Sequence, residues 1–134
     1  MKELKCHICQ KPHKRFFVLE ITSRRKGDIA NYLLCRRCLL RKLREFGFEF
    51  LIPPKHKREG VITIWMCDRC HERFATCIVE NIYCGAPGFN YTFFFCDLCE
   101  AADTEAFERD LQAGRISWQW KRNIRPIYEG GCQS

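Results

Sequence analysis

Hydrophobic periodicity in this 134-residue chain predicts two hairpin-and-helix segments in succession. In the first half, the aromatic and β-branched run 16–21 predicts a strand, and Tyr32–Leu34 returns as the second arm of a hairpin. Residues 35–46 follow as an amphipathic helix, which Gly47 is placed to end. The apolar face of this helix consists of Leu39, Leu40, Leu43 and Phe46.

A polar linker is predicted at residues 53–60, between the two halves. Pro53-Pro54 prevents a helix from passing through it, and the basic residues that follow read as solvated. Val61–Trp65 then predicts a short strand that leads into the second half. Residues 74–83 and 91–95 predict the next hairpin.

The second helix and the tail are less regular. Asp103 or Thr104 resembles a new N-cap, so we expect the helix to restart there and to end at Gly114. Beyond it, Trp118 and Trp120 alternate with polar residues as on a strand. The two tryptophans serve either to cover the core of the second module or as a docking face.

The cysteine spacing repeats with a period of 61 residues, and each repeat holds two C-x-x-C pairs that are twenty-five residues apart. Paired C-x-x-C motifs are typical of four-cysteine zinc sites, because the short gap lets both sulfurs reach one metal ion. Four thiolates leave the metal no open position, so such sites are structural. We expect two zinc ions per chain. The predicted ligands are Cys6, Cys9, Cys35 and Cys38, and then Cys67, Cys70, Cys96 and Cys99.

The order of knuckle, hairpin and helix, with the last two cysteines at the helix start, predicts a treble-clef-like arrangement. A zinc ribbon is the alternative, but the helical segment after Cys38 counts against it. We therefore expect a small, zinc-stabilised α+β fold of two tandem modules, since neither half could bury a sizeable core without a metal. The expected boundaries are 1–52 for the first module, 53–60 for the linker, 61–114 for the second module and 115–134 for the tryptophan-containing strand and tail.

Disulfides are the competing use of eleven cysteines. The N-terminus shows no apolar run of the signal-peptide kind, and no stretch is apolar over the length of a membrane span. We therefore expect a reducing intracellular compartment, cytoplasmic, nucleoid or nuclear, no membrane contact, and zinc rather than a disulfide scaffold or a redox enzyme.

Further histidines and cysteines lie outside the repeat. We interpret the histidines as surface or supporting groups, because both four-cysteine sets are complete without them. The cysteines are expected to be buried free thiols. These residues are His7, His13 and His71, and Cys77, Cys84 and Cys132.

Charge divides the chain. Residues 1–66 carry sixteen Lys and Arg against six Asp and Glu, a net +10, whereas residues 67–134 carry seven against ten, a net −3. Such a basic half favours contact with phosphates or with an acidic protein. The expected contacts are Arg24, Arg25 and Lys26 in the hairpin turn, and Arg37, Arg41 and Arg44 along one stripe of the helix.

No nucleophile–base pair, paired carboxylates, phosphate-binding loop or open metal site is recognisable in the sequence. We therefore expect a protein that is not an enzyme.

The tandem C-x-x-C frames and their short linker resemble the N-terminal zinc region of the McsA family, over residues 1 to about 100. The resemblance implies that the eight repeated cysteines bind zinc, and it implies an adaptor that activates a protein-arginine kinase and helps to deliver clients to a Clp protease. The chain ends in a tryptophan-containing strand, where that family has a helical region. Two hypotheses stand: a basic module on nucleic acid or nucleoprotein with an acidic module on protein, or an adaptor of the McsA type that contacts only proteins.

Overall fold

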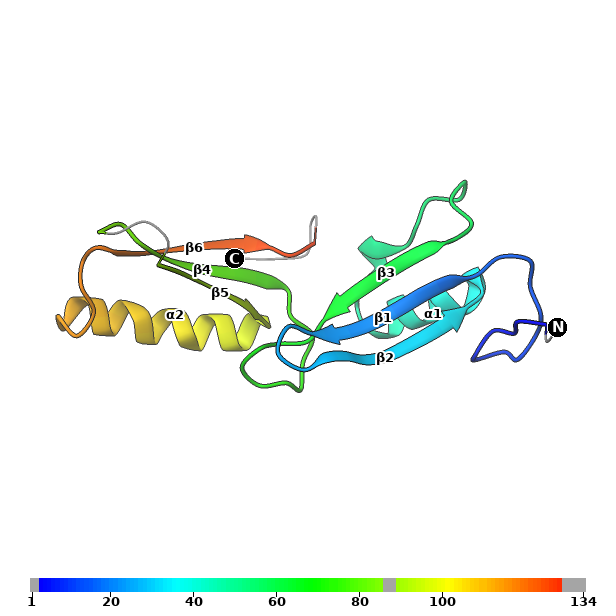
Figure 1. Cartoon of the computed structure of the whole chain (residues 1–134), viewed down its shortest axis with the longest axis horizontal. Helices are drawn as coiled ribbons and strands as arrows, with labels where there is room; N and C mark the ends of the chain where they lie inside the picture. Colours follow the sequence, from blue (N-terminus) through cyan, green and yellow to red (C-terminus); the bar gives the residue numbers. More distant parts are fainter. Residues whose placement is uncertain (1–2, 86–88, 129–134) are drawn as a thin grey trace. The chain divides into compact units, whose positions relative to one another are not determined.

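The computed structural model describes residues 3–85 and 89–128, and the chain divides into two compact units, Met1–Ile64 and Trp65–Ser134. Each unit has the same order of elements: a cysteine knuckle, two antiparallel strands, a helix and a third strand (Figure 1). The protein is thus a small α+β chain. None of the described helices is both long and apolar enough to cross a membrane.

In the first unit, a three-stranded sheet has the order β2-β1-β3. Strands β1 and β2 pair antiparallel, with Phe17 opposite Leu34 and Ser23 opposite Gly27. The elements of this unit are β1 (Phe17–Ser23), β2 (Gly27–Leu34), α1 (Arg36–Glu45), the short 3-10 helix η1 (Glu49–Leu51) and β3 (Gly60–Trp65).

Helix α1 closes the core of the first unit. Leu39 and Leu43 are fully buried, as are Phe17 and Leu19 of β1. The helix ends at Gly47, whose positive φ of 80° is easy for glycine, and whose N–H donates to the carbonyl of Arg44. The sequence prediction for this helix is therefore correct to within one residue at each end.

The second unit repeats this plan with the sheet order β5-β4-β6. Its core is built around Val79, Phe95 and the cysteines, with Phe93 and Ile124 packed against them. The elements are β4 (Cys77–Tyr83), β5 (Asn90–Phe95), α2 (Asp97–Gln112) and β6 (Trp120–Pro126).

Helix α2 is continuous from Asp97 to Gln112, so the expected restart at Asp103 or Thr104 is wrong. Both side chains bind elsewhere instead of capping a helix. The Asp103 carboxylate pairs with the guanidinium of Arg122, and the Thr104 hydroxyl accepts a hydrogen bond from the same guanidinium at 2.9 Å.

The third strand of each unit extends the repeat beyond the cysteine frame. Strand β3 pairs with β1 of the first sheet, although we expected residues 61–65 to open the second module. Shifted by 61 residues, β3 falls almost wholly within β6, which pairs with β4 along its length. The structural repeat is therefore a knuckle, hairpin, helix and closing strand.

The two tail tryptophans have different environments. Strand β6 starts at Trp120, whose ring lies 5.1 Å from that of Tyr83 and 5.8 Å from that of Tyr91. Trp118 precedes the strand and is 81% exposed. Trp120 thus covers the sheet, whereas Trp118 is available to solvent.

Candidate metal centres and basic surface

Two elements of each unit bring four cysteines together. The knuckle contributes the first pair, and the start of the helix contributes the second, with Cys35 and Cys96 as N-caps. Within each group the sulfur atoms all lie within 4.8 Å of one another. The groups are Cys6, Cys9, Cys35 and Cys38, and Cys67, Cys70, Cys96 and Cys99.

The knuckles have the same backbone hydrogen bonds. The N–H of Gln10 donates to the carbonyl of Cys6 at 3.0 Å, and the N–H of His71 donates to that of Cys67 at 3.1 Å. Gln10 and His71 are 61 residues apart, and both have positive φ, 62° and 56°. This left-handed residue reverses the chain directly after the C-x-x-C pair, which leaves both sulfurs on one side.

Each knuckle is also fastened to the second arm of its hairpin. The N–H of His7 donates to the carbonyl of Leu33 at 2.8 Å, and the Leu33 N–H donates back to Nδ1 of His7 at 3.0 Å. In the second unit, Asp68 makes the equivalent pair with Phe94, at 2.7 and 2.8 Å. His7 therefore supports the knuckle through its acceptor nitrogen.

The donor set fits zinc. In a tetrahedral site with Zn–S bonds of about 2.3 Å, neighbouring sulfurs are about 3.8 Å apart. The Sγ atoms of Cys70 and Cys96 are 4.0 Å apart. Four thiolate donors in a tetrahedral arrangement are typical of structural zinc. The two clusters are thus candidate zinc sites, and their closed shells leave no place for a substrate.

The thiols of the first cluster differ in acidity. Burial favours the neutral form of Cys6, but hydrogen bonds from the backbone at Cys35, Cys9 and Ile8 outweigh it and lower the pKa of Cys6 to about 6. Burial and the neighbouring sulfurs of Cys35 and Cys6 raise the pKa of Cys38 to about 12. A dication between the sulfurs would favour the thiolate form of all four.

The second cluster has the same division. Burial opposes ionisation of Cys70, yet hydrogen bonds from the backbone at Glu72 and Arg73 lower its pKa to about 7. Burial and the sulfurs of Cys96, Cys67 and Cys70 raise the pKa of Cys99 to about 12. One thiol of each knuckle is therefore prepared for metal binding, and one thiol at each helix start must lose its proton to the metal.

Basic groups support the clusters without completing them. Nε2 of His13 lies 3.6 Å from Sγ of Cys9. In the second unit, Arg73 hydrogen-bonds to Cys96, which raises the pKa of the guanidinium. His71 is half-buried beside the second knuckle.

The cysteines outside the repeat differ from our expectation of buried free thiols. Cys77 is buried, but it forms a disulfide. Cys84 is free but exposed, because it follows the last residue of β4. Cys132 lies outside the described residues.

The six predicted basic contacts do not form one patch, although all six are exposed. Arg24, Arg25 and Lys26 occupy the turn between β1 and β2, roughly 20 Å along the hairpin from the start of α1 at six strand rises. Arg37 and Arg41 lie together with Lys11 in a hollow of about 350 Å³ beside Cys9 and Cys38.

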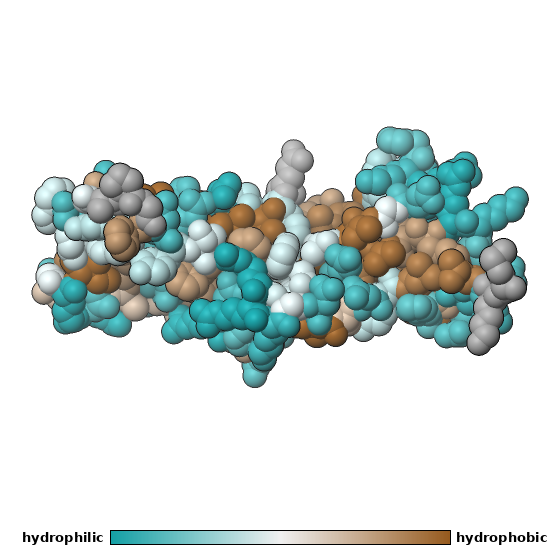
Figure 2. Space-filling view, viewed as in Figure 1, coloured by the Kyte–Doolittle hydropathy of each residue, from teal (hydrophilic) through white to brown (hydrophobic). Residues whose placement is uncertain are grey.

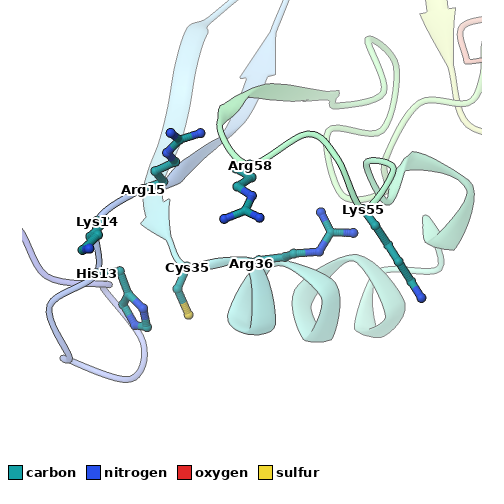
Figure 3. A pocket seen from close by; sticks show the side chains of 7 residues that line it. All are labelled: His13, Lys14, Arg15, Cys35, Arg36, Lys55 and Arg58. Atoms are coloured by element: carbon teal, nitrogen blue, oxygen red, sulfur yellow. The ribbon is translucent and has the colours of Figure 1, made fainter.

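A second basic hollow of about 600 Å³ was missed by our reading of the sequence (Figure 3). We had assigned its linker residues to a solvated segment, and the loop before β3 does carry a hydrophilic surface (Figure 2). Its position beside the first metal site could not be deduced from local pattern. The lining residues are His13, Lys14, Arg15, Cys35, Arg36, Lys55 and Arg58.

Fold and clusters together define a small α+β zinc-binding protein. A scan against models of known protein families found no match, and neither did searches of curated proteins and of solved structures. The resemblance to the McsA family therefore stays a prediction that rests on cysteine spacing.

Proposed function

We propose that this chain is a non-catalytic interaction protein with two treble-clef-like zinc modules. The first unit contacts nucleic acid or a nucleoprotein through its basic surface, and the second unit contacts a protein. Zinc holds the binding surfaces in place and takes no part in a reaction.

The observation that carries this proposal is a set of cations without acidic partners. Among the residues that the structure describes, neither Arg37 nor Arg41 forms an ion pair, and no acidic residue lines the hollow that they share with Lys11. Cations left in this way retain their charge for phosphate groups. Bound zinc reduces the net charge of the first unit from +10 to about +8, because each site holds four thiolates and one dication.

Salt dependence tests this function. Neutralising three or four phosphates gives a slope of log affinity against log salt of roughly −3, at about −0.9 per contact on duplex and −0.7 on single strands. Replacing Arg37, Arg41 and Arg44 together with Ala should flatten the slope in fluorescence anisotropy. All three are exposed, so zinc content and helicity should be retained.

The matched control is Glu105→Gln with Glu108→Gln, which changes two exposed charges on α2. It should leave nucleic-acid affinity unchanged. Binding that is undetectable at about 50 mM salt, or that the triple variant leaves intact, would contradict the proposal.

The alternative is an adaptor that contacts only proteins, as in the McsA family. Exposed apolar side chains of the second unit favour a protein contact there: Tyr91, Leu98 and Trp118 are each more than half exposed. Capture of partners from lysate that nuclease treatment leaves unchanged would support this alternative.

A further inference from the structure

The basic hollow at the start of α1 is made by three segments of the first unit that lie far apart in sequence. Lys14 and Arg15 follow the first knuckle, Arg36 opens the helix, and Lys55 and Arg58 come from the loop before β3. In Figure 3 the side chain of Arg58 extends toward the helix start at Cys35 and Arg36.

Arg36 fixes the loop that completes the hollow. Its guanidinium donates to the carbonyl of Pro53 at 2.7 Å, to that of Lys57 at 3.1 Å and to that of Pro54 at 3.3 Å. Because these bonds tie the loop to the start of the helix, Lys55 and Arg58 are held near Arg15 instead of moving freely on a linker.

The charge of the hollow is strongly positive. Five permanent cations line it, and no carboxylate does. The adjoining zinc site would contribute a net −2, so about +3 remains. Within the described part of the chain, Arg15, Lys55 and Arg58 form no ion pair and no hydrogen bond to a cysteine sulfur.

The second unit shows that the cysteine frame does not require these cations. Shifting by 61 residues places Thr76 where the first unit has Arg15, and Asp97 where it has Arg36. There the Thr76 hydroxyl donates to the Asp97 carboxylate at 2.5 Å. Gln119 takes the place of Arg58. The same four-cysteine arrangement is thus built with a neutral and acidic surface at this point.

We propose that this hollow binds a phosphate monoester dianion. Such a group carries up to two charges and three strong acceptor oxygens, which suits several cations converging from three sides, whereas a backbone diester carries one charge. The volume is in the range of small-ligand sites, so a nucleotide unit attached to the phosphate fits. Resting on the proposed function, the source would be the phosphorylated end of a nucleic-acid strand. A free mononucleotide offers the same chemistry.

The test compares single-stranded oligonucleotides of one sequence that carry a phosphate or a hydroxyl at the end, with adenosine monophosphate and adenosine as the free source. The full zinc-loaded chain should prefer the phosphorylated end by about tenfold or more, the value of one or two charge-assisted hydrogen bonds. The double variant Arg15→Thr with Arg58→Gln installs the residues of the second unit, so it should fold and retain zinc, and it should lose the preference.

The control is Arg25→Gln with Lys26→Gln, which removes the same charge at the hairpin turn and should keep the preference. Equal affinity for both ends, or a preference that the double variant retains, would overturn the proposal. Monophosphate binding that depends on Arg15 and Arg58, without oligonucleotide binding, would support the hollow and contradict the nucleic-acid function. Binding of neither probe would contradict both.

Discussion

The buried contact between α2 and β6 offers the sharpest test of how the second unit is held together. The Arg122 side chain is 6% exposed, and its guanidinium pairs with Asp103 and donates to Thr104 at 2.9 Å and to Asn81 at 3.0 Å. It also lies 4.7 Å from the centre of the Phe107 ring. The first unit has Val61 at the equivalent position, so this network belongs to the second unit.

Breaking this pair should be costly, and the cost should depend on which partner stays behind. Removing one member of a buried ion pair costs about 3–5 kcal/mol. Arg122→Met leaves Asp103, which is 34% exposed and can rehydrate, so we expect about 3 kcal/mol. Asp103→Asn leaves a cation that is 6% exposed, so we expect about 4 kcal/mol.

A double-mutant cycle measures the coupling. Hydrogen exchange of the zinc-loaded protein should show protection lost in α2 and β4, with the first unit unchanged, and the double variant should be less destabilised than the sum by about 2 kcal/mol. On the same strand, Arg125 pairs with Glu80 at 2.7 Å but is 58% exposed, so Arg125→Met should cost less than about 1 kcal/mol. Additive effects, or equal losses for Arg122→Met and Arg125→Met, would refute the reasoning.

Three further predictions concern the metal and the core. Elemental analysis should find two zinc ions per chain, and a strong chelator should abolish the circular dichroism of the folded protein; one ion or none would contradict the assignment of both clusters. Cys35→Ser should unfold the first unit while amide NMR signals of the second persist, whereas joint loss would indicate a single cooperative core. Burial raises the pKa of Tyr128 to about 12, against the lowering effect of the N–H bond from Trp65, so the folded state retains the phenolic proton more tightly than the unfolded state. Its stabilising effect should therefore be complete below about pH 10 and decline by about 3 kcal/mol as the pH rises to 12, a decline that denaturant titrations should not find in Tyr128→Phe.

Local pattern predicted those parts of the fold whose determinants are close in sequence. The first helix places Leu39 and Leu43 on one buried face, and Gly47 supplies the left-handed turn that ends it. Cysteine spacing predicted both clusters for the same reason, since a C-x-x-C pair and a helix start are local features.

Features that depend on distant partners could not be predicted in this way. Asp103 resembled a helix cap because the residue that binds it, Arg122, lies on another strand. Strand β3 was given to the wrong hairpin because its pattern shows a strand but not its neighbour. The equivalent positions in β6 are polar or charged, with Arg122 and Arg125 where β3 has Val61 and Ile64, so hydrophobicity conceals the shared period.

The same comparison separates what builds the fold from what the surface can bind. The knuckle bond of Gln10 and that of His71 differ by 0.1 Å, and His7 and Asp68 serve the same purpose with different side chains. Around this constant frame, Arg36 is exchanged for Asp97 at the first position of the helix. A frame that accepts a charge reversal beside its metal site does not depend on that charge for folding. The cations of the first unit therefore need another explanation, and the binding of phosphate provides one that can be tested.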